Sequence, residues 1–104
     1  MASGVYAKVD VSSASTWTTV VAPPAAGVKV ATVTLCNRTG SNLSVRLALA
    51  ATTSVTDSDV IEYDTTIPAN GVLERTGIVL DTSNGLQVYA SAAGLTAVAY
   101  GIDS

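Results

Sequence analysis

Apolar positions along the chain recur at every second residue, in short runs separated by polar turns. Within residues 43–49, leucine and valine occupy the odd positions, and serine, arginine and alanine occupy the even ones. Strict alternation is typical of a β-strand that buries one face. No long segment has the spacing of an amphipathic helix. The pattern therefore predicts an all-β protein.

The apolar runs and the turn residues between them predict eight short strands. The expected strands are residues 5–11, 17–21, 28–37, 43–50, 60–67, 72–80, 86–91 and 95–102. Eight short strands at close spacing favour an antiparallel β-sandwich, either immunoglobulin-like or jelly-roll. We expect residues 17–104 to form this single domain. Residues 1–16 are expected to be either an arm that adds a strand to a neighbour or an ordinary edge strand.

Three pairs of consecutive strands are predicted to form hairpins, because each connecting loop contains a glycine that can take a positive φ. The three loops are residues 38–42, 68–71 and 92–94. In the second hairpin, placing Ile67 opposite Val72 sets Asp64 opposite Arg75. We therefore expect an Asp64–Arg75 ion pair on one face of that hairpin.

Charged residues are scarce, and their scarcity bears on the character of the protein surface. They make up 12% of the chain, against about 25% in a typical soluble domain. A domain of this size buries only about 60–70% of its unfolded surface, so uncharged side chains must cover much of the outside. Exposed surface of that kind is typically covered by a partner. We therefore expect a homo-oligomer.

Several classes of partner are disfavoured. A net charge of −3 with five scattered cations argues against nucleic acid, which requires clustered Lys and Arg. Polar residues and glycines interrupt the uncharged segment 82–102, which argues against a membrane-spanning helix. The N-terminus has no basic segment followed by an apolar run, so we expect no signal peptide and synthesis in a cytoplasm. The single Cys36 is expected to be a small buried hydrophobic residue.

Candidates for catalysis and metal binding are few. The chain has no His to activate a nucleophile, and no known motif surrounds Lys8 or Lys29. Glu62 and Asp64 would project to the same side of a regular strand, but such pairs are too common to indicate a glycosidase. We expect no enzyme and no cofactor. The acidic cluster in residues 57–64 favours a solvated rim, with a weak calcium site as the alternative.

Four residues are candidates for an interface: Trp17, Tyr63, Asp64 and Arg75. Trp17 is the sole tryptophan and is either an interface anchor or a core residue. Asp64 and Arg75 are the expected ion pair, and Tyr63 precedes Asp64.

Two segments resemble small virion structural proteins of tailed bacteriophages, including those that infect cyanobacteria. The first reads CNRTGS at residues 36–41, and the second reads IPANGVLERTGI at residues 67–78. The closing residues 98–102 are similar as well, and the resemblance covers residues 28–102. It implies a β-rich virion part, either a head decoration (cement) protein or a module of the tail or its fibres.

Together these features lead us to expect a non-enzymatic virion protein. The preferred hypothesis is a capsid decoration protein that forms a trimer and contacts the major capsid protein or other virion proteins. Binding only to the assembled state would stabilise the shell by mass action. The alternative is a tail-fibre or baseplate module that binds a receptor or a glycan. A weaker third hypothesis is an assembly chaperone that leaves the mature particle.

Overall fold

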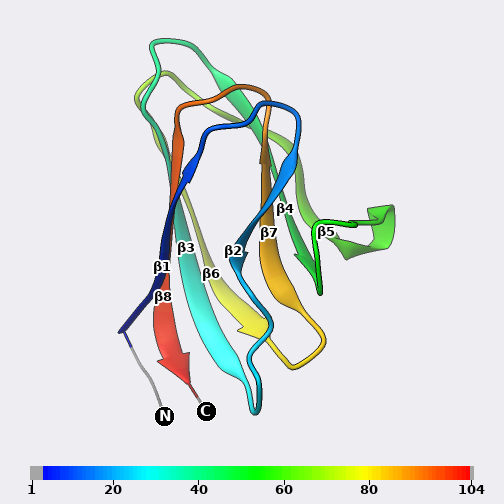
Figure 1. The fold of residues 1–104 in the computed structure, drawn as a ribbon. Helices are drawn as coiled ribbons and strands as arrows, with labels where there is room; N and C mark the ends of the chain where they lie inside the picture. Colours follow the sequence, from blue (N-terminus) through cyan, green and yellow to red (C-terminus); the bar gives the residue numbers. More distant parts are fainter. Residues whose placement is uncertain (1–3, 104) are drawn as a thin grey trace.

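The computed structural model describes residues 4–103, which form eight strands and one short 3-10 helix (Figure 1). The elements are β1 (Gly4–Val11), β2 (Trp17–Val21), β3 (Lys29–Asn37), β4 (Leu43–Ala50), η1 (Asp57–Asp59), β5 (Val60–Ile67), β6 (Val72–Leu80), β7 (Gly85–Ala90) and β8 (Leu95–Asp103). The predicted all-β class is confirmed. No helix among the described residues is long and apolar enough to cross a membrane.

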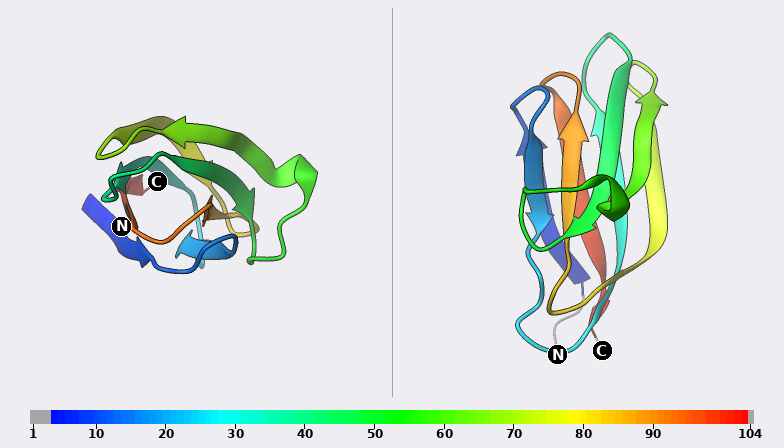
Figure 2. Two further views of the ribbon diagram at one scale, coloured as in Figure 1. Left: turned by 90° about the horizontal axis from the view of Figure 1, so that it is seen from above. Right: turned by 90° about the vertical axis from the view of Figure 1, so that its right-hand side faces the viewer.

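The strands form two four-stranded antiparallel sheets that pack face to face (Figures 1 and 2). Sheet A has the strand order β1-β8-β3-β6, and sheet B has the order β2-β7-β4-β5. Only β4 and β5 are neighbours both in the sequence and within a sheet. An immunoglobulin sandwich pairs several consecutive strands within a sheet, whereas an eight-stranded jelly roll interleaves its strands between the sheets. The described strands therefore form a jelly roll.

The three predicted hairpins are wrong. β3 and β4 lie in different sheets, as do β5 and β6, and β7 and β8. Their loops are arches from one sheet to the other. A short glycine-containing loop can close an arch as well as a hairpin, so the local pattern does not determine which strands pair. The choice depends on the packing of the two buried faces, which is a non-local property.

The expected division of the chain at residue 16 stays a prediction. In the structure, Gly4–Val11 is an edge strand of sheet A and pairs with β8. Residues 1–3 lie outside the described residues.

The core between the sheets is aliphatic. Its largest fully buried apolar side chains are Leu35, Leu43, Leu47, Ile67, Leu80, Leu86, Leu95, Val11, Val33, Val45 and Val88. Burial of each such side chain contributes about 1.5–3 kcal/mol relative to exposure. Tyr6 packs against this core, whereas Trp17, Tyr63 and Tyr89 lie outside it.

Asn37 fastens the loops at one end of the sandwich and is itself fully buried. Its Nδ2 lies 2.8 Å from the carbonyl oxygen of Ser41, 3.1 Å from that of Ile67 and 3.0 Å from that of Pro68. Its Oδ1 accepts from the backbone N–H of Thr39 at 2.9 Å and from the Thr39 hydroxyl at 2.7 Å. One side chain thus ties the β3–β4 loop to the β5–β6 loop.

Backbone contacts extend this clamp. Asn70 N donates to Thr39 O at 3.1 Å, and Arg38 N donates to Gly94 O at 2.9 Å. Gly94 has a φ of 106°, and a Cβ at this position would lie 2.4 Å from Thr39 Cγ2, so a larger residue does not fit. The two segments that resemble phage proteins therefore meet at one end of the fold, where their conspicuous residues have structural roles.

Asn37→Ala is expected to lower the free energy of unfolding by about 2–4 kcal/mol, because it removes a buried donor and a buried acceptor that join the β3–β4 loop to the β5–β6 loop. Urea unfolding measures the change. The matched control is Asn42→Ala, since Asn42 is exposed and accepts one 3.3 Å bond from Ala69 N. The control is expected to change stability by at most about 0.5 kcal/mol, and equal effects of the two substitutions would contradict the clamp.

Candidate interaction surfaces

A row of aromatic and charged side chains crosses the outer face of sheet B. The strand register sets Trp17 of β2 opposite Tyr89 of β7, and Tyr89 opposite Arg46 of β4. Tyr63 and Asp64 of β5 complete the row on the far side of Arg46. We call these five residues the aromatic row.

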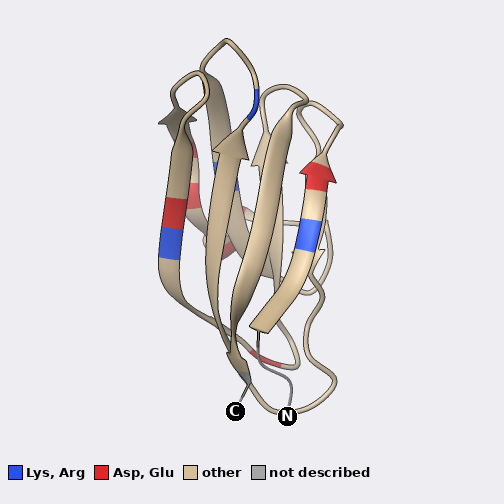
Figure 3. Ribbon diagram, turned by 90° about the vertical axis from the view of Figure 1, so that its left-hand side faces the viewer, with Lys and Arg blue, Asp and Glu red and all other residues tan. Residues whose placement is uncertain are grey.

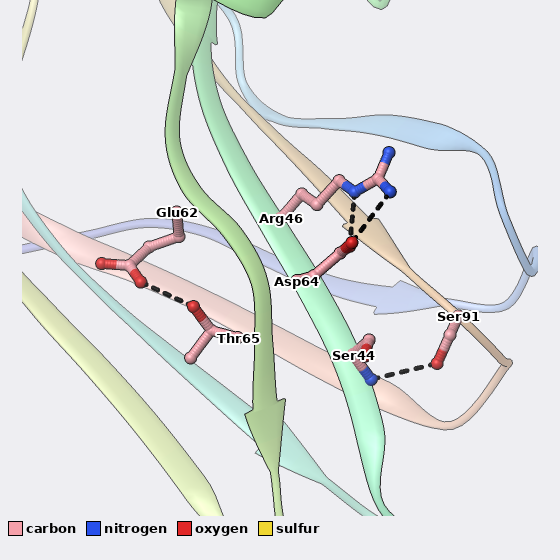
Figure 4. A network of polar contacts seen from close by, with 6 residues as sticks. All are labelled: Ser44, Arg46, Glu62, Asp64, Thr65 and Ser91. Carbon is pink, nitrogen blue, oxygen red and sulfur yellow. Dashed lines mark hydrogen bonds and ion pairs between the residues drawn. The ribbon is translucent and has the colours of Figure 1, made fainter.

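The aromatic row is held together by ring contacts and one ion pair. The ring centroids of Trp17 and Tyr89 are 5.5 Å apart, with an interplanar angle of 54°. The guanidinium carbon of Arg46 lies 4.3 Å from the Tyr63 ring centroid and 4.6 Å from that of Tyr89, so the cation contacts both rings. Arg46 Nε donates to Asp64 Oδ1 at 2.6 Å, and Nη2 donates to Oδ2 at 3.2 Å (Figure 4). This bidentate pair fixes the guanidinium plane.

A bulge in β5 brings Tyr63 and Asp64 to Arg46. Val45 is paired with Thr65, and Leu47 is paired with Glu62. The two paired positions are two residues apart in β4 but three residues apart in β5, so β5 contains one extra residue. Asp64 takes a φ of 51°, a left-handed conformation that Asp adopts more readily than most residues. Such bulges re-aim side chains. The expectation that Glu62 and Asp64 project to the same side is wrong for this reason.

The predicted Asp64–Arg75 ion pair is also wrong. β5 and β6 belong to different sheets, so their residues do not face each other in a ladder. Arg75 Nη1 instead donates to Glu62 Oε2, which links the edge strands of the two sheets. Glu62 Oε1 accepts from the Thr65 hydroxyl at 2.8 Å (Figure 4).

Three of the four predicted interface residues come together in this arrangement. Trp17, Tyr63 and Asp64 lie in the aromatic row, and Arg75 lies at the edge of the sandwich. Trp17 is half-buried on the outer face and is not part of the aliphatic core. Its role in an interface stays a prediction.

Sequence reasoning missed Arg46 and Tyr89, which occupy the middle of the aromatic row. Strand alternation carried a usable signal for both. Arg46 stands between the buried Val45 and Leu47, and Tyr89 stands between the buried Val88 and Ala90. Both therefore point outward. Their proximity depends on the pairing of β4 with β7, which the sequence pattern did not reveal.

The acidic cluster in residues 57–64 is dispersed. Asp59 Oδ2 accepts from Thr56 N at 2.9 Å and from the Thr56 hydroxyl at 3.0 Å, as an N-terminal cap of η1. Glu62 and Asp64 are each paired with an arginine. Within residues 4–103, no group of three or more acidic or cysteine residues is placed to hold a metal ion.

Residues 51–59 cover another part of the outer face of sheet B (Figure 2). Ala48 and Gln87 face each other across β4 and β7, and both are fully buried. Gln87 Nε2 donates to Ala50 O at 3.0 Å, and its Oε1 accepts from the Thr19 hydroxyl at 2.7 Å. In the aromatic row, by contrast, Tyr63 is 62% exposed, and Trp17, Arg46 and Tyr89 are half-buried.

The outer face of sheet A has a different character. Val5, Val30, Val72, Val79 and Ile102 are exposed there, and they are five of the six exposed large hydrophobic residues that the structure describes. The central strands carry no charge along residues 30–37 and 95–102, and their charged residues, Lys29 and Asp103, stand at the strand ends. The other charged residues of this sheet lie on the edge strands β1 and β6 (Figure 3). We call this surface the apolar face.

Cys36 lies on the apolar face, opposite Val72 of β6 and Thr96 of β8. It is half-buried, so the prediction of a small buried core residue is wrong. Its two neighbours in the chain, Leu35 and Asn37, are fully buried and point into the sandwich. Alternation along β3 therefore turns Cys36 outward.

No protein-family model and no curated protein matches the sequence. Among solved structures, the chain is similar to a pentameric capsid protein isolated from metagenomic phage sequences, with a TM-score of 0.42 and 16% sequence identity. The alignment covers 94% of this chain and 63% of that chain, so this chain spans less than two thirds of that protein's length.

The ion pair of the aromatic row makes stability depend on pH. The hydrogen bonds from Arg46 lower the pKa of Asp64 below its ordinary value, and the same contact raises the pKa of Arg46. A lowered carboxyl pKa in the folded state contributes stability above the unfolded value of about 4, and this contribution is lost as pH falls through the folded value.

Asp64→Asn is therefore expected to lower the unfolding temperature at about pH 7, by an amount that shrinks as the pH falls and the wild-type carboxylate is protonated. Asn retains the tolerance for a left-handed φ, so the substitution removes the charge and one acceptor oxygen without adding backbone strain. Asp57→Asn is the matched control, because Asp57 is exposed in the same region and its carboxylate bonds to none of the described residues. A loss at neutral pH that persists in acid would contradict the ion-pair explanation.

Proposed function

We propose that the protein is a non-enzymatic structural component of a bacteriophage particle, and specifically a capsid decoration protein. The resemblance of residues 28–102 to small phage virion proteins supports this class. The jelly roll is compatible with it, since capsid domains, lectins and cupins share this architecture. Fold alone does not define a function, so the proposal depends on the surfaces.

The aromatic row is the observation that carries the proposal. Trp, Tyr and Arg are the residue types most enriched at the centres of protein interfaces, and here they form one stripe across a sheet. Arg46 is already held by Asp64 and by two rings, so little side-chain entropy remains to be lost on binding. We infer that the stripe docks on the major capsid protein or on another shell protein.

Docking of this kind would stabilise the shell by mass action. A protein that binds the assembled lattice and not its dissociated subunits shifts the equilibrium toward the lattice. The apolar face of sheet A remains available for contacts between copies of this chain. The trimer expected from the sequence stays a prediction, which the mass of the isolated assembly tests.

Particles stripped of this protein are expected to lose resistance to heat and to chelator and to regain it when the purified protein is added back. Trp17→Ala and Tyr63→Ala are each expected to weaken rebinding by about tenfold or more, since truncated interface anchors typically cost that much. Thr53→Ala, an exposed change in the loop beside the aromatic row, is the matched control and should rebind normally.

Unchanged resistance of the stripped particles would refute the decoration hypothesis. Normal rebinding by both aromatic variants would refute the assignment of the aromatic row. Tyr63 is the cleaner of the two positions because it is 62% exposed, so its truncation removes little packing.

A receptor- or glycan-binding module of a fibre or baseplate is the second candidate. The same aromatic row favours it, because an exposed tyrosine beside a tryptophan and an ion pair can contact a sugar ring and its hydroxyl groups. Binding of a host envelope polysaccharide that is lost in Tyr63→Ala, together with a tail position in a density map of the particle, would establish this function. A head position without polysaccharide binding would exclude it.

A further inference from the structure

We propose that the apolar face of sheet A pairs with the same face of a second copy of this chain, about a two-fold axis parallel to the strands. This proposal concerns the protein alone and does not depend on the proposed function. It follows from where the exposed apolar and charged residues lie in the strand register.

An apolar row crosses three adjacent strands of this face. Val30 of β3 lies opposite Val79 of β6 on one side and opposite Ile102 of β8 on the other. The three side chains are 44%, 52% and 64% exposed, respectively. Isolated surface valines are ordinary, but a contiguous exposed row marks an interaction site.

A second row of the same face carries one charge at each end. Lys8 of β1 is paired with Val98, Val98 with Thr34, and Thr34 with Glu74 of β6. Lys8 and Glu74 are therefore at the same height along the strands but on opposite edges of the sheet. Three strand spacings separate them, about 14 Å, which is too far for an ion pair within one chain.

Glu74 is held over the face. Its Oε2 accepts from the Tyr100 hydroxyl at 3.1 Å and from the Thr34 hydroxyl at 3.4 Å. Lys8 is exposed and forms no ion pair with the described residues. One edge of the apolar face thus offers an available cation and the other offers a positioned carboxylate.

A two-fold axis parallel to the strands makes these features self-complementary. Such an axis exchanges the two edges of the sheet and preserves height, so β1 lies over β6 of the partner. Lys8 then meets Glu74 of the partner subunit, Glu74 meets Lys8 of the partner subunit, and the apolar rows stack on each other. A two-fold axis perpendicular to the strands would set the apolar row against the opposite end of the partner's sheet and would separate the charges. Self-complementarity about one axis is the property of an isologous dimer contact, so a second copy of this chain is the partner that fits the face.

The size of the apolar face indicates how tightly two copies are expected to associate. Four strands of about eight residues cover on the order of 500 Å² per copy. A pair would bury about 1,000 Å² in total, which is below the usual range for stable complexes. We therefore expect reversible association that depends on concentration. A trimer based on another surface remains compatible with this contact if two trimers join back to back.

Charge reversal tests the pairing directly. Lys8→Glu and Glu74→Lys are each expected to weaken self-association by about tenfold or more, because each sets like charges against each other twice. An equimolar mixture of the two variants is expected to associate as the wild type does, since every contact in the mixed pair joins opposite charges. The double variant K8E/E74K is expected to recover as well. Sedimentation equilibrium measures the self-association of the two single variants, of their mixture and of the double variant. Asp57→Lys is the control, since Asp57 is exposed outside the apolar face.

Loss of the Tyr100 contact in Glu74→Lys is a side effect that the mixture controls for, because the mixed pair still contains this substitution. Unfolding temperatures close to that of the wild type verify that each variant is folded. Failure of the mixture to recover would overturn the proposal, as would normal association of the single variants. A wild type that is monomeric alone but binds stripped particles through Lys8 and Glu74 would assign the face to a shell protein and overturn the pairing, while leaving the decoration function intact.

Discussion

The packing of the two inner sheet faces is the interaction on which the rest of the structure depends. All connections among the described strands except β4–β5 cross from one sheet to the other, so neither sheet is a continuous piece of chain. β1 and β8, from the two ends of the described chain, are hydrogen-bonded neighbours. Neither sheet can therefore form without the other, and contacts of such long sequence separation are typical of slowly folding domains. The Asn37 clamp holds the loops of this arrangement where the chain crosses between the sheets.

The outer faces follow from what the core excludes. Because aliphatic side chains fill the interior, the tryptophan and most of the charges occupy outer faces, edges and loops. Sheet B gathers an arginine between two tyrosines and a carboxylate, which satisfies the charge and leaves Tyr63 exposed. Sheet A carries its charges on the edge strands and at the ends of the central strands, and it exposes valine and isoleucine on its outer face. One small domain thus presents two surfaces of different chemistry on opposite sides, which suits a protein that contacts both its own copies and a second partner.

The strands were predictable from sequence because alternation is local. Residues 43–50 and 60–67 have the predicted bounds, and the fold class follows from the number of strands. Strand pairing was not predictable, because Gly40, Gly71 and Gly94 permit an arch as readily as a hairpin. The predicted Asp64–Arg75 ion pair was wrong for the same reason. The predicted direction of the Asp64 side chain was wrong because a bulge with a positive φ breaks the alternation that the prediction assumed. The outward direction of a residue such as Arg46 could be predicted from alternation in its own strand. That these residues lie in one row could not be predicted, because it depends on the strand order.

The central claim is that a small sandwich with so few charges associates through its outer faces. Sedimentation equilibrium of the wild-type protein, from micromolar to millimolar concentration, tests it most directly. The account predicts a mass that rises from that of the 10.5 kDa chain to a multiple of it as concentration increases. A single 10.5 kDa species across the whole range would contradict the account.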